Sequence, residues 1–165
     1  MADDQHSLFR EGAEAGVLGA LAVALWFLLL DVLHGQPFLT PSVLGQVVVF
    51  GRDTPAMAPV PEAIAAYTGV HFLAFVLLGM AVARIVDLAA HEPVFRFLLF
   101  MLFVSFELFF LGVTYIFFAE TAGLFPWWSI LVANTLAAVV MAVYFRYRHP
   151  TLVQAMGEPL GGETT

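Results

Sequence analysis

The sequence contains no cysteine and no lysine, and it is poor in charged residues of any kind. Without cysteine, the chain cannot form disulfides, thiolate metal sites, iron–sulfur clusters or the covalent attachment of a c-type haem. Its six basic residues, all arginine, are outnumbered by 13 acidic ones, which gives a formal net charge of −7. Affinity for nucleic acid comes mainly from basic side chains that neutralise phosphates, so this balance predicts no nucleic-acid partner.

Motifs of soluble enzymes are missing as well. The sequence has no nucleophile elbow, phosphate-binding loop, HExxH zinc motif or dinucleotide-binding fingerprint. It therefore predicts no catalytic residues and no enzyme of the soluble type.

Apolar residues, in contrast, are abundant. Hydrophobic residues make up 61% of the chain and charged residues 12%, compared with roughly 25% charged residues in typical soluble domains. The chain has 17 phenylalanines, and its mean hydropathy is +0.91. A water-soluble fold needs more polar surface than this, so lipid is expected to cover much of the protein.

Four long apolar segments are each close to the roughly 20 residues that cross a bilayer core. Strands are disfavoured, because alternation is absent and an open sheet cannot satisfy its backbone groups in lipid. The sequence thus predicts an all-α fold, a four-helix transmembrane bundle over residues 12–148, between a tail at 1–11 and a flexible tail at 149–165. The predicted spans are residues 12–33, 64–86, 94–118 and 124–144.

Residues 35–61 form the one long connection between the predicted spans. Within it, Thr40 and Pro41 are typical of a helix start, with Thr40 as the N-cap and Pro41 at the first helical position. The apolar residues 42–50 are too few to span a membrane, so they predict a short helix in the outer interface. A lid over the helix ends is favoured here over a loop that gates a ligand.

Arginine placement predicts the orientation of the chain. Cytoplasmic loops carry an excess of basic residues, and a cytoplasmic N-terminus puts five of the six arginines inside. The inside set is Arg10, Arg84, Arg96, Arg146 and Arg148, and only Arg52 lies outside. Both termini are therefore expected in the cytoplasm.

The first span carries small residues at four-residue spacing: Gly12, Gly16, Ala20 and Ala24. Such a stripe lets another helix approach closely, which is a main source of helix association in lipid. Packing within one chain is favoured over a seam between two copies. The phenylalanine-rich third span suits contact with lipid or with another membrane subunit.

Five polar residues fall at membrane depth, where each is a candidate functional residue: Asp31, His34, His71, Glu107 and Asn134. From the 1.5 Å rise per helical residue, Glu107 lies about 20 Å from the inner end of its span. By the same measure, His71 and Asn134 lie roughly 10–15 Å below the outer face. These three are expected to meet at one level, with Asp31 and His34 above them near the outer boundary.

Three interpretations of this polar set remain open. In the favoured one, the residues form a structural hydrogen-bond cluster that fixes the helix arrangement. In the second, Glu107 and His71 exchange protons along a path for protons or solutes that opens outward. In the third, the set binds haem or a metal, for which the weak candidate ligands are Asp31, His34, His71 and Glu107. Their spacing is loose and their depths differ, so no cofactor is predicted.

Several segments resemble a family of small four-helix bacterial membrane proteins to which no activity is attached. The similar residues are 19–27, Asp31, 40–45, His71-Phe72, 106–109 and 127–134. The resemblance implies a bacterial inner-membrane location. The expected role is that of an accessory or structural subunit of a membrane assembly, with other membrane subunits or as a homo-oligomer, and the alternative is a small proton-linked or solute-conducting protein.

Overall fold

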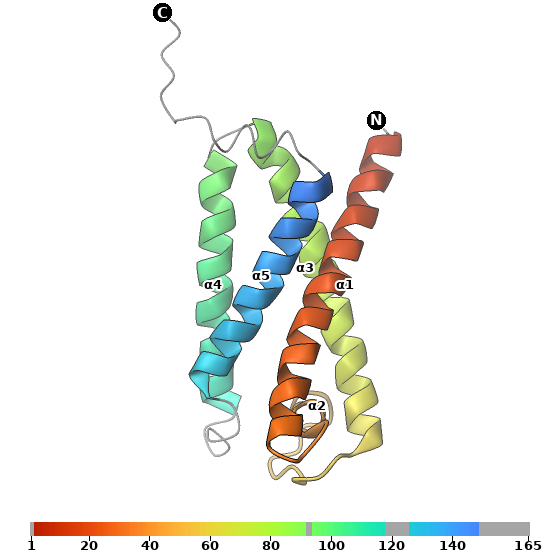
Figure 1. Ribbon diagram of the computed structural model, residues 1–165, viewed down its shortest axis with the longest axis vertical. Helices are drawn as coiled ribbons and strands as arrows, with labels where there is room; N and C mark the ends of the chain where they lie inside the picture. The colour runs from red at the N-terminus through yellow and green to blue at the C-terminus, as the bar shows by residue number, and fades with distance from the viewer. Residues whose placement is uncertain (1, 92–93, 118–125, 149–165) are drawn as a thin grey trace, which may run out of the picture.

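The computed structural model describes residues 2–91, 94–117 and 126–148 of the chain. The regular structure within these ranges is helical throughout, without strands (Figure 1). The elements are α1 (Ala2–Leu33), α2 (Leu39–Leu44), the π-helical turn η1 (Gly45–Val49), α3 (Pro61–His91), α4 (Val94–Phe117) and α5 (Trp127–Arg148).

Three of the described helices are long and apolar enough to cross a membrane. The segments are Leu8–Leu33 in α1, Pro61–Leu88 in α3 and Trp127–Arg148 in α5. In α4 the described apolar stretch is the shorter Phe100–Phe109. These lengths and compositions fit a membrane protein, in agreement with the low content of charged residues.

The helices are arranged around α3. Helix α1 packs along α3 and α5, whereas α4 lies against α3 and α5, and α2 and η1 pack on α3. The start of α1 and the end of α5 lie at the same end of the molecule, and α2 lies at the opposite end (Figure 1). Residues 2–33 and 127–148 thus run in opposite directions across the protein.

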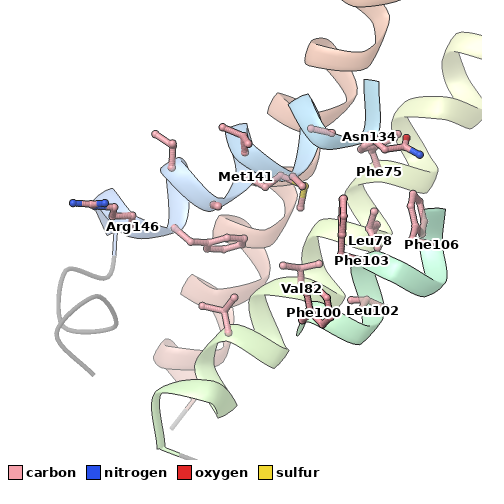
Figure 2. A pocket seen from close by; sticks show the side chains of 17 residues that line it. Phe75, Leu78, Val82, Phe100, Leu102, Phe103, Phe106, Asn134, Met141 and Arg146 are labelled. Carbon is pink, nitrogen blue, oxygen red and sulfur yellow. The ribbon is translucent and has the colours of Figure 1, made fainter. Parts of the chain in front are cut away.

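On the side of α4 the packing is open. A cavity of about 630 Å³ lies between α3, α4 and α5 (Figure 2). Phenylalanines from α4, including Phe100, Phe103 and Phe106, line it together with small residues of α5 such as Ala138 and Ala142. Helix α4 therefore stands off from its neighbours along much of its length.

On the side of α1 the helices touch backbone to backbone. A β-carbon added to Gly16 would lie 2.2 Å from the carbonyl oxygen of Phe75, and one added to Gly79 would lie 2.2 Å from the carbonyl oxygen of Gly12. Ala20 is fully buried in the same contact, but Ala24 is exposed. The small-residue stripe thus packs against α3 from Gly12 to Ala20 and ends there.

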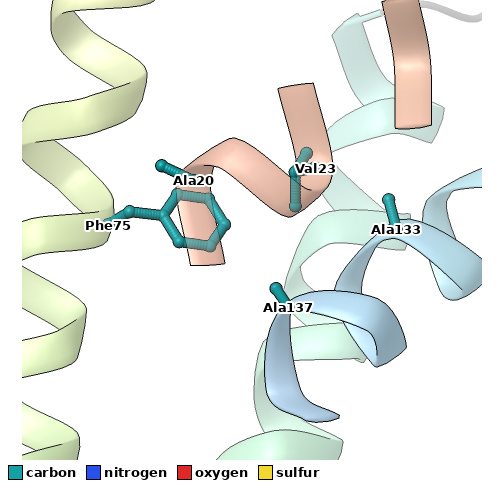
Figure 3. Packing of buried hydrophobic residues seen from close by; sticks show 5 residues of the cluster. All are labelled: Ala20, Val23, Phe75, Ala133 and Ala137. Atoms are coloured by element: carbon teal, nitrogen blue, oxygen red, sulfur yellow. The ribbon is translucent and has the colours of Figure 1, made fainter. Parts of the chain in front are cut away.

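The core between α1, α3 and α5 is built mainly from small apolar side chains around one phenylalanine ring. Figure 3 shows this cluster, which consists of Ala20, Val23, Phe75, Ala133 and Ala137. The alanines let α5 approach α1 closely, so association here depends on van der Waals packing, the term that acts between helices in lipid.

Three helices extend beyond the predicted spans, among them α3, which runs over Pro61–His91 instead of 64–86. Helix α1 begins at Ala2, inside the predicted tail 1–11, and α5 ends at Arg148 rather than near residue 144. Hydropathy marks the part of a helix in the hydrocarbon core, whereas polar turns continue the helix into the head-group region. The predicted tail 149–165 and the link 118–125 lie outside the described residues.

The start of α2 differs from the prediction. The helix begins at Leu39 after Phe38, which has a left-handed backbone (φ 65°) and makes no side-chain cap. Thr40 is therefore not the N-cap. Its N–H donates instead to Oδ2 of Asp31 (2.8 Å), so a carboxylate from α1 satisfies one of the free N–H groups at the helix start.

Candidate functional site

Asp31 joins the end of α1 to the start of α2. Its Oδ1 accepts a hydrogen bond from the Thr40 hydroxyl (2.6 Å), in addition to the bond from the Thr40 N–H, and both side chains are buried. The carbonyl oxygen of Asp31 accepts from the N–H of Gln36 (2.9 Å), in the turn where Gly35 takes a positive φ of 73°. Both carboxylate oxygens are thus used to hold the connection between α1 and α2 in place.

His34 is exposed and makes a local contact. Its Nδ1 lies 2.7 Å from the carbonyl oxygen of Leu30, one turn earlier, and therefore donates to it. Asp31 and His34 are three residues apart and were expected near the same boundary of the membrane. They do not form a shared site, because each side chain has a different partner.

His71 joins α3 to α1. Its Nε2 lies 3.1 Å from the carbonyl oxygen of Ala20 and acts as the donor, since a carbonyl oxygen only accepts. The imidazole stacks on Tyr67 with ring centroids 5.7 Å apart and contacts the Phe75 ring at 4.8 Å. Aromatic neighbours and a backbone partner leave the ring fixed between two helices.

Glu107 and Asn134 join α4 to α5. The Asn134 side-chain amide donates to Oε2 of Glu107 (3.2 Å), and both residues are buried. The other carboxyl oxygen, Oε1, is buried without a hydrogen-bond partner among the described residues. A buried polar group without a partner costs free energy, so Oε1 is the least satisfied polar atom of this set.

The five predicted residues therefore divide into separate contacts instead of one cluster. The expected link between His71 and Glu107 is not made: His71 bonds to α1, while Glu107 bonds to α5. His71 bonds to the backbone of α1, whereas the α3 residues that line the cavity toward α4 begin one turn later, at Phe75, and continue through Leu78 to Val86. Asp31 bonds to α2 and makes no contact with either of them.

The described residues contain no group of three histidine, aspartate or glutamate side chains close enough to hold a metal ion. The weak candidate ligands Asp31, His34, His71 and Glu107 thus do not converge on one point. Metal ligands must lie within about 2–2.5 Å of a common ion, which this arrangement does not provide.

The cavity beside Glu107 is apolar along its length. Asn134, the partner of Glu107, lines one end, and Arg146 lines the other end of the same face of α5 (Figure 2). The remaining lining residues are Phe75, Leu78, Val82, Val86, Phe100, Leu102, Phe103, Phe106, Ala137, Ala138, Val139, Met141, Ala142, Val143 and Phe145. Its size lies within the roughly 300–1,000 Å³ of ordinary ligand pockets.

Ser42 and Gln46 organise the connection between α1 and α3 and were not singled out from the sequence. Both are fully buried. The Ser42 hydroxyl donates to the carbonyl oxygen of Ala58 (2.9 Å) and accepts from the N–H of Val60 (2.9 Å). Gln46 bonds to both backbone groups of Ala56. The N–H of Ala56 donates to Oε1 of Gln46 (2.9 Å), and its carbonyl oxygen accepts from Nε2 (3.1 Å). Two polar residues four apart in an apolar segment were the available signal.

Glu14 organises the opposite end of the protein and was also missed. Its Oε2 accepts hydrogen bonds from the Tyr144 hydroxyl and from Arg148 (3.0 Å), so α1 and α5 are joined across 134 residues of sequence. Arg10 adds an ion pair to Oε1 (3.5 Å). An acidic residue inside the first predicted span was the signal for this contact.

No protein-family model, curated protein or solved structure matches the chain. The resemblance to small bacterial membrane proteins accordingly stays a prediction.

Proposed function

We propose that the chain is a four-helix integral protein of a bacterial inner membrane, with both termini in the cytoplasm. Three helices have the length and composition of spans. The 24 residues of α4 extend about 36 Å, more than the roughly 30 Å of a bilayer core, which supports α4 as the fourth span. The arginine distribution supports the orientation, and α2 with η1 then caps the outer end.

In this proposal the protein is an accessory or structural subunit of a membrane assembly. The observation that supports it best is the use of the intramembrane polar groups. Asp31, His71 and Glu107 each bond to a residue of another element, so they hold helices together. Polar contacts of this kind between membrane helices contribute about 0.6 kcal/mol on average and fix the helix arrangement.

The exposed face of α4 provides a surface for lipid or another subunit. Phe97 is 64% exposed and Leu108 is 67% exposed, on a helix that contacts only part of α3 and α5. In a subunit, such a face is where a second copy or a different membrane protein packs. Whether a second copy or a different membrane protein packs there, the lipid bilayer surrounds the rest of the protein.

The subunit role is tested by native gel electrophoresis after mild solubilisation of membranes. We expect the chain to migrate in a complex larger than the monomer. The double variant Phe97→Ala with Leu108→Ala is expected to release the monomer. A matched variant on α1, Leu25→Ala with Leu29→Ala, removes comparably exposed side chains (62% and 51%) and should leave the complex intact. A monomer in every sample would contradict the subunit role.

A second function, a small proton-linked or solute-conducting protein, is supported by one observation. Oε1 of Glu107 is buried without a partner among the described residues, next to Asn134 at the end of the cavity. An unpaired carboxyl group at membrane depth is typical of proton relays. Proton flux into proteoliposomes that stops in Glu107→Gln would favour this function over the subunit role.

A further inference from the structure

The cavity between α3, α4 and α5, which we call the slot, is lined along α5 from Asn134 to Arg146, and its volume of about 630 Å³ leaves room for a hydrocarbon chain. Phenylalanine rings of α3 and α4 form one wall, and the small side chains of Ala138 and Ala142 leave space along α5. Apart from Asn134 and Arg146, all its lining residues are apolar. A slot of this composition excludes water-soluble ligands, because their polar groups would find no hydrogen-bond partners along its walls.

The length of the slot matches one leaflet of a bilayer. Asn134 and Arg146 lie at its two ends and are 12 residues apart on α5, which corresponds to about 18 Å. Half of a hydrocarbon core is about 15 Å. Because Arg146 lies in the last turn of a membrane-spanning helix, its end of the slot is at the bilayer surface, and the Asn134 end is near the middle.

The charge at the surface end is available to a ligand. Arg84 pairs with Asp87 (3.2 Å) and Arg148 pairs with Glu14 (3.0 Å), but Arg146 makes no ion pair with a described residue. In Figure 2 its guanidinium points away from the other labelled side chains, toward the end of the helix. A guanidinium in this position can bind a phosphate through two parallel hydrogen bonds.

We propose that this slot binds an anionic phospholipid, with one acyl chain between α4 and α5 and the phosphate of the head group on Arg146. The apolar walls, the length of one leaflet and an arginine at the surface end that pairs with no described residue together specify this ligand. Basic pockets between membrane helices are known to select anionic head groups. The assignment goes beyond the role of a subunit and does not depend on it.

The test is native mass spectrometry of the full chain released from nanodiscs that contain equal amounts of phosphatidylglycerol and phosphatidylcholine with identical acyl chains. We expect one lipid per chain to be retained, with phosphatidylglycerol preferred about fivefold, the effect of one basic residue near a membrane surface. Arg146→Gln is expected to abolish this preference. Arg148→Gln removes the same charge from the same turn, outside the slot, and should preserve it.

A second variant tests the slot itself. Ala142→Phe is expected to fill the slot and prevent lipid retention, whereas Leu136→Phe, an exposed position of α5 outside the lining, should not. Equal retention of both lipids in the unmodified protein, or a preference unchanged by Arg146→Gln, would overturn the proposal.

The other possible occupant is a helix of a partner protein. A photo-crosslinking amino acid at Val139, which lines the slot, distinguishes the two in intact membranes. An adduct with the mass of a phospholipid supports the proposal. An adduct with a protein and none with lipid overturns it.

Discussion

The two sides of α3 are packed in opposite ways. Toward α1, glycine and alanine bring the backbones together, so that a β-carbon at Gly16 would lie 2.2 Å from a backbone oxygen. Toward α4, phenylalanine rings keep the helices apart and a cavity of about 630 Å³ remains. The comparison shows that small residues give close and specific packing in lipid, whereas large aromatic residues give a looser interface that has room for another molecule.

The largest expected effect comes from replacing a glycine with alanine, at Gly16 in the close contact with α3 and at Gly112 on α4. Gly16→Ala should lower the free energy of unfolding by about 1–3 kcal/mol, because the backbone of α3 cannot move away without loss of packing. Gly112→Ala on α4 meets nothing within 4 Å and should be neutral or stabilising by up to about 1 kcal/mol, since alanine favours helix over glycine. Thermal unfolding in detergent measures both. Equal effects would contradict the difference between the two sides.

An effect of similar size is expected at the connection between α1 and α3. Gln46→Leu removes the side chain that bonds Ala56 and Arg52, and leaves the N–H and the carbonyl oxygen of Ala56 without these partners. The expected cost is about 1–3 kcal/mol, with faster proteolysis within residues 51–60. The matched substitution Gln36→Leu, at an exposed glutamine, should change neither measurement. Equal protease sensitivity of both variants would show that Gln46 does not order the loop.

His71→Phe tests the contact between α3 and α1 at a smaller scale. It keeps an aromatic ring and removes the hydrogen bond to Ala20, which should cost about 0.6 kcal/mol and at most about 1.7 kcal/mol. His34→Phe, at an exposed position, serves as its control.

Because the candidate ligands do not converge, the unmodified protein is also expected to show no Soret band and no stoichiometric metal. A Soret band that disappears in His71→Phe would contradict this account.

The sequence was sufficient to predict that the chain is helical and fits a membrane protein, and also that Gly12, Gly16 and Ala20 form a packing stripe. Long apolar runs and small residues at four-residue spacing are local signals. The exposure of Ala24 was not predictable in this way, because the length of a helix contact depends on the angle at which the helices cross.

The partners of the polar residues could not be predicted for a related reason. Which side chains meet depends on the order and rotation of the helices, and neither is encoded in hydropathy. His71 and Glu107 were expected to meet because their depths agree, yet they bond to different helices. The contact of Glu14 with Tyr144 joins residues that are 130 positions apart. The contacts of Asp31 with Thr40, nine residues apart, and of His34 with Leu30, four residues apart, are in contrast local in sequence.

The most direct test of the structural role of the polar residues is Glu107→Gln, measured for thermal stability in detergent and for proton flux in proteoliposomes. Glutamine keeps the oxygen that accepts from Asn134, so we predict a change in the free energy of unfolding within about 0.5 kcal/mol and no change in flux. Glu107→Ala, which removes that oxygen, should be clearly less stable. Proton flux in the unmodified protein that is lost in Glu107→Gln, at unchanged stability, would contradict the account and make Glu107 a proton-transfer residue.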